Sequence, residues 1–490
     1  MSVLIAIPIL CPIIAGATLF PATARRSEGN NRKYIAAVAA LSAGLALALL
    51  TAPGFELRAL HITDVINFYI RIDDLSRFFI FVATLLWGLI VAYSLGAIAP
   101  GGRDRRFFAC LFLTYGAIIG ACLAGNFFTL YLFYELITLF TYPLVVHNGT
   151  PEANRAGTKY LIYSFFGAGL VFLCFAVTAH FAVLSDFTAG GVFSAAVLAG
   201  NRPLLLGIFL LGFIGFGTKA YLWPLYDWVP TAYPQAPSPA AALLSGVVSK
   251  VAVIAILRLT FFTFGADFLR GEWVQTLIIC LTLITIFSGS MLAYKEKLLK
   301  RRLSYSSVSQ LSYILFGVAL LNPIALLGAL LHVLFHGIIK VTLFLSAGTI
   351  EQQTGKRYVQ DMRGVGKSAP ITLWCFAIAA VALVGVPPTA GFVSKVRLGL
   401  GGIASDFPSL GLFGVGVLIV SSLLAAGYLV PIFASAFFPG SKFDYESVSP
   451  KDPGRLIVVT LIILAALSLL LGIFPGAVIN FVSEIIALIL

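Results

Sequence analysis

The chain has 490 residues, of which 60% are hydrophobic and 11% are charged, and its formal net charge is +12. Soluble chains average about 25% charged residues, and the apolar runs here are continuous over about 17–25 residues, so the composition excludes a soluble domain and a membrane β-barrel. Basic loops on one side of a membrane explain the positive charge, and nucleic acid is not an expected partner.

We therefore expect an all-α polytopic membrane protein with about fourteen transmembrane helices. The first apolar run has no basic segment before it and contains Pro8 and Pro12, so we interpret it as a retained span and not as a cleaved signal. A short apolar tail, 476–490, follows the last span. The expected spans lie near 3–20, 34–51, 78–98, 108–124, 127–146, 158–184, 204–222, 240–262, 274–293, 305–321, 325–350, 370–400, 411–438 and 455–475.

The distribution of lysine and arginine supports this number of spans. Loops after odd-numbered spans hold 21 of the 32 basic residues, loops after even-numbered spans hold five, and six lie inside spans. A wrong number of spans would have disturbed the alternation. The positive-inside rule then predicts that the odd-numbered loops are cytoplasmic and that both termini lie outside, in the cytoplasmic (inner) membrane of a prokaryote.

The sequence offers no centre for covalent chemistry. Nucleotide-binding loops, GxSxG elbows and HExxH motifs are absent, and the six cysteines are scattered within apolar runs without CxxC or Cys/His clusters. We therefore expect no catalytic residue, no metal site and no cofactor in this chain.

Five charged side chains lie at depth within the expected spans. They are Glu135, Lys219, Lys250, Lys340 and Lys395. Each costs roughly 2.5–3.5 kcal/mol at the centre of a bilayer, so together they cost above about 12 kcal/mol unless they face protein or water and are paired. Glu135 is the one clear acid at mid-span, and we expect it to be the counter-ion of Lys219.

Two of the expected spans are interrupted next to a lysine. The seventh reaches Lys219 and then enters a loop with five prolines that begins at Pro224, and the twelfth breaks at Pro387 and Pro388 before Lys395. Paired interrupted spans in the two halves of a transporter indicate ion sites. We expect discontinuous helices 7 and 12 within two inverted five-helix repeats. The expected divisions are 1–107 (three helices), 108–262 (helices 4–8), 263–438 (helices 9–13) and 439–490 (helix 14 and the tail).

The eleventh span, HVLFHGIIKVTLF, carries a stripe of titratable side chains. His332, His336 and Lys340 are spaced i, i+4, i+8, which keeps them on one face over about 12 Å. Such a stripe is suited to passing protons, because histidine titrates near neutral pH. The alternative is that both histidines only bond backbone or hydroxyl groups. The serine-rich start of the tenth span, SYSSVSQLSY, is open to two interpretations, a water chain or hydrogen bonds between helices.

Buried lysines are themselves open to two interpretations. A lysine that gains and loses its proton is a proton carrier, whereas a static buried ion pair only fixes helix packing. Four lysines on four spans favour proton transfer, because packing alone does not require so many buried charges.

At these residues the sequence resembles the antiporter-like subunits shared by respiratory complex I, group 4 membrane-bound hydrogenases and Mrp-type multisubunit Na⁺/H⁺ antiporters. The likeness covers roughly residues 70–400. The chain ends soon after the last span, without the long lateral helix of the largest complex I member, so it resembles the shorter D-like Mrp subunit or its hydrogenase counterpart. The family likeness over residues 70–400 is carried by six segments, which occur in this order: DDLSRFF, FYELITLFTYPLV, TKAYLWPLYDWVPTAYPQAPSPAAALLSGVVSKV, SYSSVSQLSYI, HVLFHGIIKVTLFLSAG and GVPPTAGFVSK.

The resemblance implies a proton-translocating subunit of a larger energy-coupling complex. It assigns proton transfer to Glu135, Lys219, Lys250, His332, His336, Lys340 and Lys395. We expect protons to pass from Lys219 to Lys250, then to His332, His336 and Lys340, and finally to Lys395. The implied partners are other antiporter-like and small hydrophobic membrane subunits, a peripheral iron–sulfur module if the complex is a redox one, protons, and Na⁺ if the complex is an antiporter.

Two other functions remain open from the sequence. One is a self-sufficient secondary transporter for a small solute, which is disfavoured because the axis offers titratable groups but no clear solute pocket. The other is a scaffold subunit without transport, which is disfavoured because it has no reason to retain the deep charges.

Overall fold

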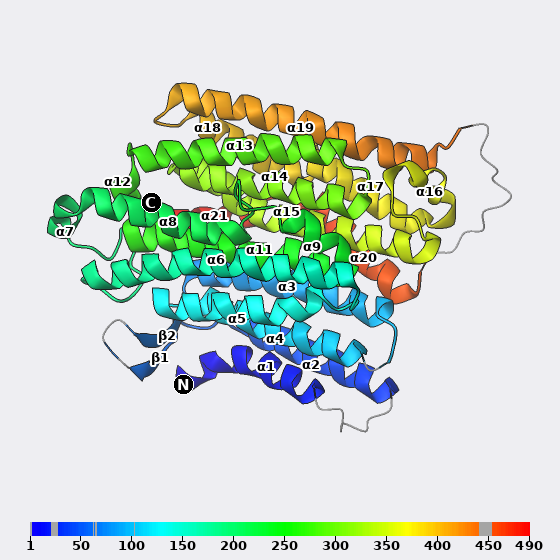
Figure 1. The fold of residues 1–490 in the computed structure, drawn as a ribbon, viewed down its shortest axis with the longest axis horizontal. Helices are drawn as coiled ribbons and strands as arrows, with labels where there is room; N and C mark the ends of the chain where they lie inside the picture. The colour runs from blue at the N-terminus through cyan, green and yellow to red at the C-terminus, as the bar shows by residue number, and fades with distance from the viewer. Residues whose placement is uncertain (1, 21–27, 62, 64–65, 102, 441–452) are drawn as a thin grey trace.

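The computed structural model describes residues 2–20, 28–61, 63, 66–101, 103–440 and 453–490. Long helices lie side by side in one bundle, with their axes in roughly the same direction (Figure 1). Within the described residues, ten helices are long and apolar enough to cross a membrane, and three shorter apolar helices accompany them. The chain is a multi-pass helical membrane protein, as its composition predicts.

The N-terminal part forms one layer of the bundle. Its elements are η1 (Ser2–Ala6), α1 (Ile7–Leu19), α2 (Glu28–Ala48), β1 (Glu56–His61), β2 (Asn67–Arg71), α3 (Asp74–Ala97), α4 (Arg103–Leu123), α5 (Phe127–Val145) and α6 (Pro151–Phe181). β1 and β2 pair antiparallel as a hairpin. Asp73 caps α3, because its side chain accepts the Ser76 N–H.

The middle of the chain contains the first helix break. Its elements are α7 (Ala195–Gly200), α8 (Arg202–Lys219), α9 (Val229–Gln235), α10 (Ser238–Leu243), η2 (Leu244–Val248), α11 (Ser249–Leu257), η3 (Arg258–Phe264) and α12 (Ala266–Leu269). From α10 to η3 the helix is unbroken for 27 residues, and its most apolar window is completely buried. η2 and η3 are turns of π-helix. π-helix is rare in proteins overall, and where it occurs it is often at a functional site.

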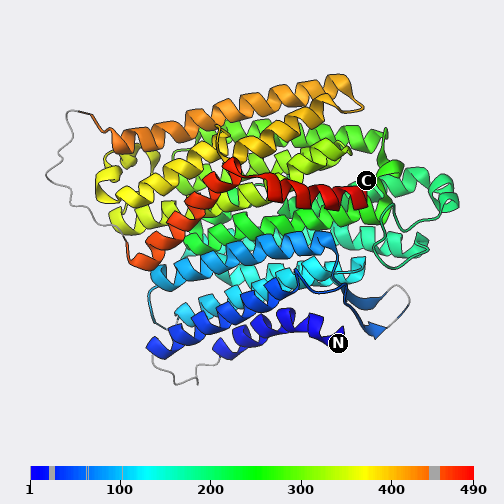
Figure 2. The same cartoon turned by 180° about the vertical axis from the view of Figure 1, so that it is seen from behind.

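The C-terminal half contains the second break. Its elements are α13 (Trp273–Lys295), α14 (Leu299–Ala319), α15 (Pro323–Thr354), η4 (Val359–Met362), α16 (Val365–Ser368), α17 (Pro370–Val384), α18 (Ala390–Ile403), α19 (Pro408–Phe437), α20 (Arg455–Ile473) and α21 (Gly476–Ile489). α14 and α15 are the buried centre of the bundle. Figure 2 shows α20 and α21 crossing over the other helices on the far side.

Each expected span has a helical counterpart among the described residues, and both predicted breaks are present. α8 ends at Lys219, five residues before Pro224, and α17 and α18 are separated by the segment with Pro387 and Pro388. The number of fourteen crossings, the inverted repeats and the four divisions stay predictions. The segment 441–452, next to the expected division at 438/439, lies outside the described residues.

The sequence reading missed the small elements. It predicted no structure for the β1–β2 hairpin or for α7, α9, α12 and α16, and it treated α21 as a plain tail. These segments are short, so apolar periodicity does not identify them. α21 packs against α15 and α3.

The two ends of the bundle carry different loops. The hairpin, α7 and α12 lie at one end, and α16 lies at the other (Figure 1). Both termini point toward the hairpin end in both views (Figure 2). The end with α16 is called the basic end here, because described residues from loops after odd-numbered expected spans, Arg103, Lys300, Lys356 and Arg357, line one cavity there. Arg25, Arg26, Lys442 and Lys451, which contributed to the charge pattern, lie outside the described residues.

Close packing holds the second break together. Gly385, just after α17, has φ +88°, a conformation that glycine adopts without strain. On α18, a Cβ at Gly391 would lie 1.9 Å from the Ala382 carbonyl oxygen of α17, so the two half-helices touch through their backbones.

Gly391→Ala should therefore destabilise the chain by about 1–3 kcal/mol, the usual cost of overpacking. Gly399→Ala on the same helix is the matched control, because a Cβ there meets nothing within 4 Å. The measurement is the thermal unfolding midpoint of each variant in detergent. Equal midpoints for the two variants would show that the backbones of α17 and α18 are not in contact.

Candidate functional site

The first deep charges form an ion pair at the α8 break. Lys219 is the last residue of α8 and is 3% exposed, and its Nζ lies 3.6 Å from Oε1 of Glu135 on α5. The same Nζ donates to the Tyr134 carbonyl oxygen at 2.8 Å and lies 3.5 Å from the centroid of the Tyr134 ring. The predicted pairing of Glu135 with Lys219 is confirmed, and Tyr134 adds a carbonyl and a cation–π contact.

Lys250 is positioned by a π-turn and reaches a histidine of α15. Its Nζ donates to the carbonyl oxygen of Ser245, in η2, at 2.7 Å, and lies 2.9 Å from His336 Nδ1. Ser249 Oγ is 3.2 Å away. Both Lys250 and His336 are almost completely buried. The lysine and the imidazole are therefore in direct hydrogen-bond contact across two helices.

The two histidines of α15 continue the chain of polar groups. Their rings stack with centroids 5.5 Å apart and an interplanar angle of 12°. His332 Nδ1 lies 2.9 Å from Ser394 Oγ on α18, and its ring stacks on Tyr313 of α14. The Nε2 atoms of His332 and His336 are buried and have no protein partner among the described residues. Buried polar groups of this kind normally bond ordered water.

Lys395 is held by the second helix break. Its Nζ donates to the carbonyl oxygens of Leu383 and Val384, at 2.7 and 3.1 Å, and to Ser422 Oγ at 3.1 Å. The two carbonyls are at the C-terminal end of α17, where the break leaves them without helical partners. Lys395 also lies 5.1 Å from the centroid of the Tyr313 ring, which stacks on His332.

Lys340 lies on a branch, and this differs from the expected order. Its Nζ donates to the Leu303 carbonyl oxygen at 3.0 Å and to Ser306 Oγ, both on α14. Lys250 contacts the middle residue of the stripe, His336, and the His332 end leads to Ser394 and Lys395. The contacts therefore do not run in the order His332, His336, Lys340 and then Lys395, because the side chains of α15 meet different neighbouring helices at each turn. The order of proton transfer itself stays a prediction.

The first break is linked to the π-turn by two tyrosines. No hydrogen bond or ion pair joins Lys219 to Lys250 in the described part of the chain. Tyr221, in the break, shares a hydrogen bond with the Tyr233 hydroxyl and donates to the Leu244 carbonyl oxygen at 3.1 Å. Leu244 precedes Ser245, whose carbonyl holds Lys250. The sequence reading did not identify these tyrosines, because no spacing rule places them between the lysines.

The serines of α14 mostly join helices together. Ser307 bonds Ser245, Ser309 bonds Ser290 and Ser421, and the Tyr313 hydroxyl donates to the Leu418 carbonyl oxygen. This supports the second of the two sequence interpretations. Gln310 and Ser312 are exceptions, because both amide atoms of Gln310 and the Ser312 hydroxyl are buried and have no protein partner among the described residues.

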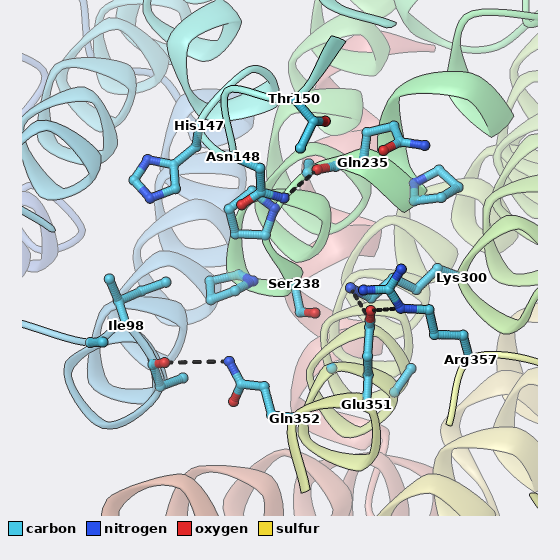
Figure 3. Close-up of a pocket in the computed structure, with 18 of the residues that line it drawn as sticks. Ile98, His147, Asn148, Thr150, Gln235, Ser238, Lys300, Glu351, Gln352 and Arg357 are labelled. Atoms are coloured by element: carbon cyan, nitrogen blue, oxygen red, sulfur yellow. Dashed lines mark hydrogen bonds and ion pairs between the residues drawn. The ribbon is translucent and has the colours of Figure 1, made fainter. Parts of the chain in front are cut away.

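A cavity of ≈1280 Å³ opens at the basic end of the bundle (Figure 3). It is lined by the loops around Arg103, His147 and Gln235, the start of α14 and the end of α15. Glu351 is paired with Lys300 at 2.7 Å and with Arg357 at 2.6 Å. Burial, together with the charges of Arg106 and Arg103, lowers the pKa of His147, so this imidazole is neutral at neutral pH.

The fold and this site define a class of protein: a polytopic membrane protein with a buried axis of titratable side chains between two broken helices. The family model described as "NADH:quinone oxidoreductase/Mrp antiporter, TM" matches residues 124–421. The chain belongs to this family of antiporter-like membrane subunits.

Individual relatives agree with the family model. The chain is 33% identical to NADH-quinone oxidoreductase subunit N of Desulforudis audaxviator, over 82% of this chain and 81% of the relative. It is 29% identical to a Na(+)/H(+) antiporter subunit of Alkalihalophilus pseudofirmus, over 96% and 94% of the two chains. A chain in the structure of the Mrp complex from Dietzia sp. has the same fold, with a TM-score of 0.87, 22% identity and coverage of 100% and 97%.

The Glu135–Lys219 pair can be tested by its effect on stability. Glu135→Gln leaves the Lys219 ammonium without its counter-ion, and breaking a fully buried pair costs about 3–5 kcal/mol. We expect a smaller loss, because the Glu135 side chain is 20% exposed.

The measurement is the thermal unfolding midpoint of Glu135→Gln, Lys219→Met and the double variant in detergent. The double variant should recover part of the loss, because it removes both charges. Losses that simply add would show that the two side chains are not coupled.

Proposed function

We propose that this chain is the proton-translocating, antiporter-like subunit of a multisubunit energy-coupling complex. Protons move from the Glu135–Lys219 pair to Lys250, then through His336 and His332 to Ser394 and Lys395. Lys340 lies on a side branch of this path and exchanges protons with Ser306 on α14. The observation that carries the proposal is the direct contact between Lys250 and His336, which joins the α10–η3 helix to α15, whose His332 in turn contacts Ser394 on α18.

Each station of this path has the chemistry that proton transfer needs. Lys250 and Lys395 have neutral partners, backbone carbonyls and hydroxyls among them, so loss of a proton leaves no counter-ion stranded. Imidazoles accept a proton on one nitrogen and release it from the other. Water bonded to Gln310 and to the two histidine Nε2 atoms would extend the path where protein contacts are missing.

The cavity at the basic end supports a direction for uptake. By the positive-inside rule this end faces the cytoplasm of a prokaryote, and both termini face outside. The cavity is lined by Ser238 at the start of α10, seven residues before Ser245. Water in the cavity would bring cytoplasmic protons to the helix that carries Lys250.

The relatives suggest the assembly. Their names place them in NADH-quinone oxidoreductases and Na⁺/H⁺ antiporters. For this chain we infer partner membrane subunits of the same kind, and either a peripheral iron–sulfur module or Na⁺ exchange according to the complex. Purification in mild detergent separates the two cases. Iron–sulfur or nickel proteins in the preparation would indicate a redox complex, and small hydrophobic subunits alone would indicate an Mrp antiporter.

Lys219→Ala should abolish coupled proton movement while the complex still assembles. The substitution removes the cation that Glu135 poises at the break, and so interrupts the path at its start. The measurement is proton uptake into membrane vesicles with a pH-sensitive dye, under the driving reaction of the complex. Lys297→Ala is the control, because this lysine is exposed in the loop before α14. Unchanged pumping by assembled Lys219→Ala would refute the assignment.

His336→Phe should reduce coupled proton movement about a hundredfold or more, in the range that a lost proton-transfer group typically costs. Phenylalanine keeps the stacked ring beside His332 but removes the nitrogen that Lys250 contacts. His180→Phe on α6 is the matched control, because His180 is exposed. If His336→Phe pumps like the control, the path does not run through α15.

A further inference from the structure

Arg258 is a buried cation on the helix that carries Lys250, but it is not part of the proposed proton path. Arg258 is 1% exposed and opens the π-turn η3. It follows Lys250 by eight residues, so it lies about 12 Å further along the helix, toward the hairpin end. The residues of α11 between the two cations are all buried.

Arg258 is part of a cluster with more positive than negative charge. Its Nη2 donates to Asp73 Oδ1 at 2.8 Å, and Arg71 Nε lies 3.4 Å from Oδ2 of the same carboxylate. Two guanidinium groups thus share one acid. Arg258 Nη1 and Arg71 Nε are buried and have no hydrogen-bond partner among the described residues.

Asp73 does not cancel this excess. Burial opposes its ionisation, but the charges of Arg258 and Arg71 and hydrogen bonds from Ser76 outweigh burial and lower the pKa of Asp73. The carboxylate is therefore ionised at neutral pH, and the cluster of three side chains retains one positive charge. Arginine does not lose its proton in proteins, so this charge is permanent.

The cluster lies where the path helix approaches the hairpin end. A cavity of ≈310 Å³ at this end is lined by Phe187 and Thr263. Both touch Arg258: the Phe187 ring centroid is 5.6 Å from its guanidinium carbon, and Thr263 Oγ1 donates to its carbonyl oxygen at 3.0 Å. Arg258 therefore lies next to two residues that line this cavity, on the side of Lys250 that faces the hairpin end.

Backbone hydrogen bonds fix the cluster in place. The π-turn leaves carbonyls free in η3, and the N–H groups of Thr188, Gly190 and Val192 bond the carbonyls of Phe262, Phe261 and Thr263. Arg71 also donates to the Phe187 carbonyl oxygen at 2.7 Å. The loop before α7 thus covers the end of η3 and holds Arg258 beside the cavity.

We propose that Arg258, held by Asp73 and supported by Arg71, is an electrostatic barrier that prevents protons from leaking between Lys250 and the hairpin end. A fixed positive charge repels protons, as an arginine does in water-selective channels. Protons on Lys250 then leave through the contact with His336 and pass along α15. This inference rests on the proposed function, since it assumes that Lys250 carries protons.

The test uses the complex purified with this chain in mild detergent and reconstituted into liposomes. A potassium gradient with valinomycin sets the membrane potential, no driving substrate is added, and a pH-sensitive dye reports the passive proton leak. Arg258→Met should raise the leak about tenfold, the effect of removing a unit charge about 12 Å away at an effective dielectric constant of about 20.

Two further variants separate a barrier from a structural contact. Arg258→Lys keeps the positive charge and should keep the leak near that of the unchanged complex. Lys250→Met in the Arg258→Met background should abolish the added leak, because the leaking protons pass through Lys250. If Arg258→Met does not assemble, Arg258→Gln, which still donates to Asp73, replaces it with the same expected leak.

The proposal is overturned if the assembled neutral variants do not leak, or if their leak persists without Lys250. It is also overturned if Arg258→Lys leaks as strongly as Arg258→Met. The passive leak is measured without turnover, whereas the proposed function is tested by driven pumping in Lys219→Ala. A failure of the barrier is therefore distinguishable from a failure of the proton path.

Discussion

An ammonium group inside a membrane needs acceptors, and lipid offers none. Lys219 and Lys340 share carbonyls within the helices α5 and α14. For Lys395 and Lys250, the acceptors come from places where the regular helix is interrupted. The end of α17 gives two carbonyls to Lys395, and the π-turn η2 gives the Ser245 carbonyl to Lys250. The breaks and the lysines are one feature, since each would be unfavourable without the other.

This constraint explains which parts of the site the sequence could predict. Prolines beside lysines in apolar runs identify the breaks, and Glu135 is the one mid-span acid, so its pairing with Lys219 followed directly. The partners that are carbonyls could not be predicted, because every residue has one. The π-turns were missed for the same reason: LSGVV and RLTFFTF have no composition that separates them from ordinary helix.

The contacts of the individual side chains of α15 could not be predicted from the sequence either. Spacing places His332, His336 and Lys340 on one face of α15, but it does not say which helix faces each turn. The packing of α11, α14 and α18 around α15 decides this. As a result, His336 contacts Lys250, Lys340 contacts Ser306 and His332 contacts Ser394. The three side chains lie in one row on α15, but each of them contacts a different neighbouring helix.

Under the two proposals, Lys250 on α11 conducts protons, whereas Arg258 at the start of η3 blocks them. Lys250 is bonded to a carbonyl, a hydroxyl and an imidazole, so its proton can leave without stranding an opposite charge. Arg258 is bonded to a carboxylate, and a guanidinium group keeps its proton under all physiological conditions. A lysine at position 258 would keep the charge, but it would lack the planar fork that holds Asp73 and Ser76 together. In the proposed barrier, arginine therefore adds a fixed geometry to a positive charge that a lysine would also supply.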